Sequence, residues 1–116
     1  MSKKYDLEER TYFFAKRCRV LINKLPYSVS NREDSKQLVR SSGSIGANYI
    51  EANEALSKKD FIYRIKISRK EAKESKFWLR LLIDSNKEFE HEFKVLIAES
   101  DELRKILSAI INSRSN

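Results

Sequence analysis

The sequence has few of the residues that make turns and bridges. Its 116 residues include two glycines, one proline, one cysteine and one histidine. Sandwiches and barrels need many turns, so this scarcity argues against an all-β fold and favours a few long helices. The single cysteine, Cys18, cannot form an internal disulfide, which indicates a reducing compartment. No apolar run approaches the roughly 20 residues of a membrane span, and residues 1–10 lack the apolar core of a secretory signal. We therefore expect a cytoplasmic protein with no membrane association.

Charge, in contrast, is abundant. The chain carries 24 Lys and Arg against 17 Asp and Glu, a formal net charge of +7. The hydrophobic fraction of 41% supplies one core, so we expect a single domain over residues 1–116. A basic balance indicates a polyanionic partner such as nucleic acid, although a solvated basic surface without a ligand is the alternative.

Apolar and small residues recur alternately three and four positions apart along most of the chain. This spacing is typical of helices that bury one face in a bundle. It predicts four helices, at about 6–25, 31–56, 58–84 and 87–113. Pro26 ends the first helix, and short connections make consecutive helices run in opposite directions. We therefore expect an all-α, antiparallel up-down-up-down four-helix bundle.

Several residues mark the ends and the middle of these helices. Asn31 and Ser57 are predicted N-caps. We call the row of apolar and small residues spaced three and four positions apart the seam of a helix, and the seam of the second helix runs to Leu56. Gly43 and Gly46 lie inside that helix, where each costs about 1 kcal/mol relative to alanine. Either a neighbouring helix approaches closely there, or the helix breaks near Gly43. The seam keeps its phase across both glycines, which favours one continuous helix.

A second apolar row flanks the seam on the first and third helices. Aromatic residues are enriched at subunit interfaces, and symmetric assembly is common among soluble proteins. The row therefore predicts a homo-oligomer, although scattered exposed aromatics are the alternative. The interface candidates are Tyr12, Phe13, Tyr63, Ile67, Phe77 and Trp78.

Most of the excess positive charge lies on the third predicted helix. Residues 57–84 contain nine Lys and Arg against four Asp and Glu. A basic stripe of this kind can track phosphates with little dependence on sequence, and the alternative is a solvated face with intrahelical ion pairs. The nucleic-acid-binding candidates are Lys58, Lys59, Lys66, Arg69, Lys70, Lys73, Lys76 and Arg80.

No arrangement of residues indicates catalysis or metal binding. A di-metal bundle needs Glu-x-x-His on two helices, and Glu88 with His91 is the single copy. His91 has no evident serine partner for a triad, and the two glycines lack the lysine and the strand of a phosphate loop. We therefore expect no enzyme, no catalytic residues, no cofactor and no metal.

Two blocks of sequence carry a family resemblance. The first is KQLVRSSGSIGANYIEA over residues 36–52. The second is KEAKE over 70–74 followed by FWLRLL over 77–82, and a weaker block is ESDELRKIL over 99–107. These blocks resemble the bacterial four helix bundle protein family, also called the 23S rRNA intervening-sequence protein family. The resemblance covers nearly the whole chain.

The resemblance implies a left-handed bundle that assembles as a ring, typically a pentamer, with no established enzymatic activity. Some members are encoded inside insertions in 23S rRNA genes, and related accessory proteins bind a reverse transcriptase with nucleic acid. Residues that match the polar motif of the family are interpreted as a network that fixes helix register. They are Arg40, Asn48, Glu51, Glu71 and Glu74.

These observations together predict a non-enzymatic, ring-forming, basic bundle that binds nucleic acid through surface Lys and Arg. Structured RNA is the expected ligand, and DNA is the other nucleic acid to test. The alternative function is a protein-interaction adaptor that does not itself contact nucleic acid. Salt-dependent binding to RNA separates the two.

Overall fold

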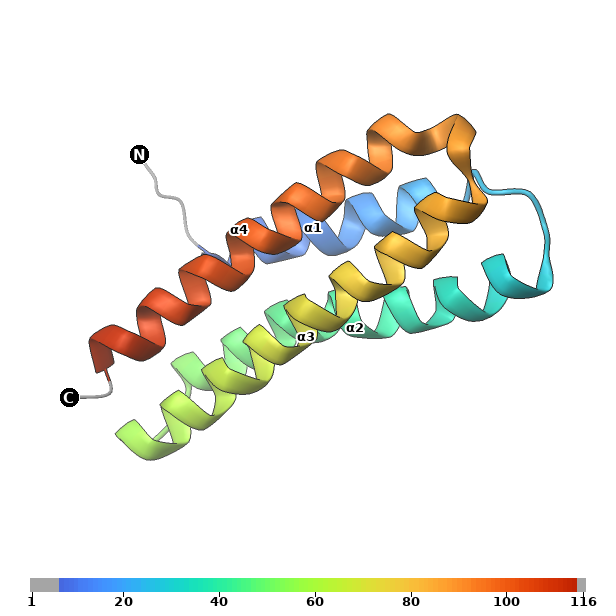
Figure 1. Cartoon of the computed structure of the whole chain (residues 1–116). Coiled ribbons are helices and arrows are strands. Elements are labelled where there is room, and N and C mark those ends of the chain that lie inside the picture. The colour runs from blue at the N-terminus through green and yellow to red at the C-terminus, as the bar shows by residue number, and fades with distance from the viewer. Residues whose placement is uncertain (1–6, 115–116) are drawn as a thin grey trace.

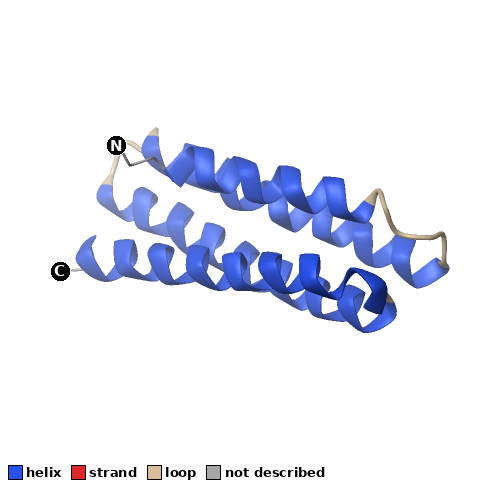
Figure 2. Ribbon diagram, turned by 90° about the horizontal axis from the view of Figure 1, so that it is seen from above, coloured by secondary structure: helices blue, strands red, loops and turns tan. Residues whose placement is uncertain are grey.

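The computed structural model of the chain describes residues 7–114, and all their regular structure is helical. The four long helices are α1 (Leu7–Ile22), α2 (Val29–Asn53), α3 (Lys58–Ser85) and α4 (Glu90–Arg114). A short 3-10 helix, η1 (Lys87–Phe89), precedes α4. The long helices lie lengthwise beside one another, and the chain turns back at each connection (Figures 1 and 2). The predicted all-α four-helix fold is confirmed.

The contacts between helices are uneven. The pair α2 and α3 packs most extensively, α3 with α4 and α1 with α2 follow, and α1 touches α4 least. Helices α1 and α3 make no close backbone approach, so they lie diagonally across the bundle. The outer face of α3 is therefore far from α1.

The connection between α1 and α2 differs from the prediction at both ends. Helix α1 ends at Ile22 rather than near residue 25, because the chain tightens into a turn there: the N–H of Leu25 bonds the carbonyl of Ile22. Helix α2 begins at Val29, and its N-cap is Ser28 rather than Asn31. The Ser28 hydroxyl accepts a hydrogen bond from the Asn31 N–H at 3.0 Å. The predicted cap at Asn31 was therefore wrong by one turn.

Asn31 has a different role, which sequence reasoning missed. It is buried, and its side-chain amide exchanges two hydrogen bonds with that of Asn86, at 3.0 and 2.8 Å. The two amides also donate to the carbonyls of Pro26 and Leu82. This pair ties the α1–α2 connection to the residue between α3 and η1.

At the other end of the bundle, the connection between α2 and α3 is longer than predicted, because α2 ends before residue 56. Helix α2 ends at Asn53, and the next two N–H groups bond carbonyls three residues back, which bends the chain outward. Leu56 is therefore fully exposed, and its prediction as a seam residue was wrong. Ser57 caps α3 as expected, since its hydroxyl accepts from the Asp60 N–H at 3.0 Å.

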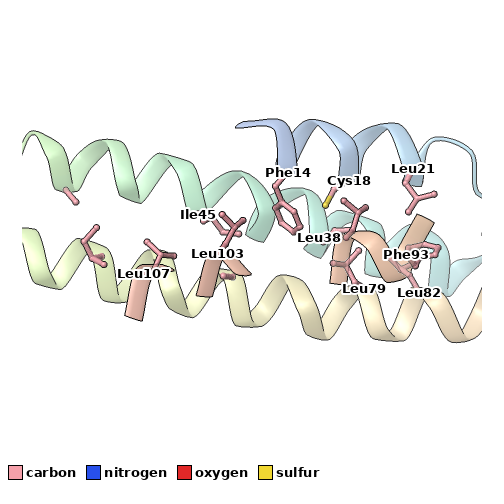
Figure 3. Close-up of a cluster of buried hydrophobic side chains, with 14 of the residues drawn as sticks. Phe14, Cys18, Leu21, Leu38, Ile45, Leu79, Leu82, Phe93, Leu103 and Leu107 are labelled. Carbon is pink, nitrogen blue, oxygen red and sulfur yellow. The ribbon is translucent and has the colours of Figure 1, made fainter. Parts of the chain in front are cut away.

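The core is built from the remaining seam positions of all four helices. Figure 3 shows large side chains from each helix meeting inside the bundle, among them Phe14, Leu38, Leu79, Phe93 and Leu103. Small residues alternate with them and let α2 and α3 approach closely. Their hydroxyls are satisfied internally: Ser68 donates to the Ile45 carbonyl at 2.7 Å, and Ser75 donates to Ser41 at 2.9 Å. No buried polar side-chain atom within residues 7–114 lacks a partner.

The two glycines lie inside α2, which is one continuous helix. A Cβ atom added to Gly46 would lie 2.7 Å from the hydroxyl oxygen of buried Thr11 on α1. At Gly43 the nearest atom would be the end of the Arg19 side chain, at 3.3 Å. The predicted close approach of a neighbouring helix is therefore confirmed at Gly46, and that helix is α1.

Cys18 lies in the core, where burial raises the pKa of its thiol from 9.0 to about 12. About a thousandfold less thiolate is then available at pH 8. We predict that iodoacetamide leaves the native protein unlabelled at pH 8 and labels it readily in guanidinium. Because the fold favours the neutral thiol, its stabilising contribution is fully present below about pH 9 and is lost as the pH rises towards about 12. Rapid labelling of the native protein, followed by mass spectrometry, would contradict this.

None of the helices within residues 7–114 combines the length and the apolar composition needed to cross a bilayer.

Candidate nucleic-acid interface

The outer face of α3 carries a row of free cations. Lys59, Lys66, Lys70 and Lys73 are all exposed, and none has an ion-pair partner among residues 7–114. The spacing of four and then three residues from Lys66 to Lys73 places these three on one side of the helix, over about 10 Å of its axis. We call Lys66, Lys70 and Lys73 the lysine row.

The other candidates on α3 have different surroundings. Arg69 and Lys76 turn towards α4: Arg69 donates to the Ser108 hydroxyl at 3.2 Å, and Lys76 pairs with Asp101 at 3.1 Å. Lys58 is exposed at the first position of the helix, and Arg80 is exposed near its last turns. The eight predicted residues are therefore divided between an outward row and an edge that faces α4.

The polar motif residues are only partly brought together. Arg40 on α2 reaches across to α3, where its guanidinium lies 3.1 Å from a carboxylate oxygen of Glu71 and 2.9 Å from one of Glu74. The hydrogen bonds that the Arg40 guanidinium donates to the Glu71 carboxylate raise the pKa of Arg40. Asn48 instead accepts from Arg64 and donates to the Ser44 carbonyl. Glu51 is exposed and does not reach this cluster.

Removing Arg40 should destabilise the bundle modestly. Glu71 is 6% exposed, and without Arg40 its carboxylate would be left without a cationic partner. Because Arg40 is itself half exposed, we expect Arg40→Met to lower the free energy of unfolding by about 1 kcal/mol. In a Glu71→Gln background the same change should cost clearly less. Urea melts of the two single variants and the double variant measure this, and strictly additive losses would refute the coupling.

The interface candidates form two separate groups. Tyr12 and Phe13 on α1 are 56% and 50% exposed, and their rings meet edge to face. Tyr63 and Phe77 on α3 are 58% and 52% exposed. Since α1 and α3 are diagonal, the two groups lie on different faces. The other two candidates, Ile67 and Trp78, are half-buried, and Trp78 packs on the core.

His91 and the possible metal ligands can be located within residues 7–114. Among the residues that the structure describes, no three His, Cys, Asp or Glu side chains gather closely enough to hold a metal ion. His91 is exposed on α4 beside a groove between α1 and α4, next to Glu92 and Val95.

Comparison with known proteins places the chain in a family. The model of a family described as 23S rRNA-intervening sequence protein matches residues 3–109. A crystal structure of a protein of unknown function from the S23 ribosomal protein family of Bacteroides thetaiotaomicron is 35% identical. The two superpose with a TM-score of 0.80 over 91% of this chain and 98% of that one. No curated protein matches the sequence. Since both the family model and this solved relative cover nearly the whole chain, the protein belongs to the 23S rRNA-intervening sequence protein family.

Proposed function

We propose that this protein is a non-enzymatic, homo-oligomeric RNA-binding protein that contacts structured RNA through the outer face of α3. The observation that carries the proposal is the lysine row. On α2 all three cationic side chains lie within 4.0 Å of a carboxylate. Lys66, Lys70 and Lys73 have no such partner among residues 7–114. Their charge is therefore available to a polyanion.

Lysines arranged in this way recognise phosphates rather than bases. Each ammonium group that meets a phosphate displaces condensed counterions, which gives affinity that falls with salt and depends little on sequence. The family description, which concerns a 23S rRNA intervening sequence, favours RNA over DNA as the ligand.

Assembly into an oligomer would strengthen the binding of RNA, because several lysine rows would contact it together. One row of three lysines binds a phosphate backbone weakly at physiological salt, but several copies in one oligomer would bind the same RNA with a high effective concentration. The exposed aromatic pair Tyr12 and Phe13 on α1 supports contact between copies. It lies on a different face from the lysine row, so assembly through it would leave that row accessible.

The test is a binding titration of the purified protein with a labelled RNA hairpin and a DNA duplex across a salt series, with the mass in solution measured alongside. Three phosphate contacts for each subunit on the RNA predict that the affinity falls at least about 20- to 40-fold between about 50 and 200 mM salt, and more when several subunits bind one RNA. A folded oligomer that binds neither ligand at low salt would refute the proposal and favour the protein-interaction adaptor. A monomeric mass would refute the homo-oligomer.

A further inference from the structure

Two adjoining hollows share one aromatic side chain on α3. The first lies between α3 and α4, has a volume of about 310 Å³, and includes Lys73, Lys76, Phe77, Arg80 and Arg104 in its lining. The second, of about 230 Å³, lies further along α3, where Leu81, Ile83 and the carboxylate of Asp84 line it together with two residues of the first hollow. Phe77 and Arg80 belong to both linings, so the two hollows adjoin at these residues.

The lining of the first hollow is predominantly cationic, which suits an anion. Four cationic side chains line it against one carboxylate, that of Asp101. Asp101 holds Lys76 at 3.1 Å and lies 4.0 Å from Arg104, so it orients two of the cations without neutralising the group. Lys73 and Arg80, one turn to either side of Phe77, have no carboxylate partner within residues 7–114. Such a lining favours a phosphate, because an arginine can donate two hydrogen bonds to its negatively charged oxygens.

The second hollow offers an apolar surface beside that charge. Phe77 is 52% exposed and Leu81 is 39% exposed. Trp78 contacts the Phe77 ring edge to face with centroids 5.0 Å apart and itself packs on the core, so the Phe77 ring is supported on one side. An exposed, braced aromatic ring next to cations is the arrangement on which proteins stack unpaired bases.

We propose that the two hollows together bind one unpaired nucleotide, such as a bulged or loop nucleotide of RNA. Its phosphate is held by Lys73, Arg80 and Arg104, and its base stacks on Phe77 on the side of Leu81. This inference rests on the proposed RNA-binding function and adds the class of ligand. It requires an unstacked base, because bases inside an A-form helix are stacked on each other and cannot reach the ring.

The experiment compares an RNA hairpin that has a single-nucleotide bulge in its stem with the same hairpin fully paired. We expect the wild-type protein to bind the bulged hairpin about tenfold more tightly, since stacking one base contributes a factor of that order. Phe77→Leu should remove this preference and leave binding to the paired hairpin unchanged. Tyr63→Leu is the matched control, because Tyr63 is equally exposed on α3 but lines neither hollow. It should leave the preference intact.

Trp78 provides a second readout. It is the only tryptophan and it touches the Phe77 ring, so the bulged hairpin should change its emission more than the paired one does. Equal affinity of the wild-type protein for both hairpins would overturn the inference while leaving the proposed RNA binding in place. Binding to neither hairpin would overturn both. If Phe77→Leu lowers the mass of the oligomer, Phe77 is a contact between copies and the inference fails. Circular dichroism shows that each variant is folded.

Discussion

Replacing Lys66, Lys70 and Lys73 together by Glu should weaken RNA binding roughly 100-fold at moderate salt, equivalent to about 2.7 kcal/mol. The three side chains lie on one face of α3 and have no carboxylate partners among residues 7–114, so the fold does not neutralise their charge. The change removes three phosphate contacts and places three repulsive charges in their position. The slope of log affinity against log salt should also fall by about 3 for each subunit that contacts the RNA.

A control variant with the same net charge separates a local effect from a global one. Lys16, Lys36 and Lys105 are exposed on α1, α2 and α4. Their replacement by Glu changes the total charge equally but leaves the lysine row intact, so affinity should fall much less, since exposed charges more than about 10 Å away are screened. If both triple variants lose affinity to the same extent, binding follows net charge alone and α3 is not the interface. Thermal melts show that each variant remains folded.

The lysine row was predictable because it depends only on position along one helix. Once the seam of α3 is known, Lys66, Lys70 and Lys73 must lie away from it, whatever the neighbouring helices do. The same argument explains why the four helices could be predicted. The apolar period continues through Gly43 and Gly46, and neither glycine costs enough to stop a helix whose buried face is continuous.

The helix ends were less predictable because they depend on hydrogen bonds that periodicity does not encode. Leu56 fits the seam of α2, but backbone bonds from residues 54 and 55 turn the chain before it. Asn31 is a good N-cap residue in isolation, yet Ser28 takes that place because the Asn31 amide is bound to Asn86, 55 positions away. A distant partner of this kind leaves no local signal.

The hollow between α3 and α4 could not be predicted from the sequence either. Its charge combines Lys73 and Arg80 with Arg104 and Asp101, and the last two residues belong to a weaker motif block on α4. That they face the cations of α3 depends on how α4 is rotated and shifted against α3. Only the side-chain contacts of the folded chain, such as the pair of Lys76 with Asp101, fix that register.

The contact between α1 and α2 at Gly46 should be highly sensitive to side-chain size. Gly46→Val is expected to lower the free energy of unfolding by about 3 kcal/mol, because its Cβ would start 2.7 Å from the Thr11 hydroxyl oxygen and its two methyl groups add further overlap. Thr11 is 1% exposed and cannot swing into solvent, so α1 must move away from α2. Urea unfolding followed by circular dichroism measures the change.

Two further variants show that the effect is steric. Gly43→Ala meets only the end of the flexible Arg19 side chain, so the gain in helix propensity should dominate and stabilise the protein by about 0.5–1 kcal/mol. Thr11→Ala removes the clashing oxygen, and in that background Gly46→Ala should cost less than it does in the wild type. If Gly46→Ala is as well tolerated as Gly43→Ala without that relief, α1 does not approach α2 this closely. Position 46 would then be glycine for another reason.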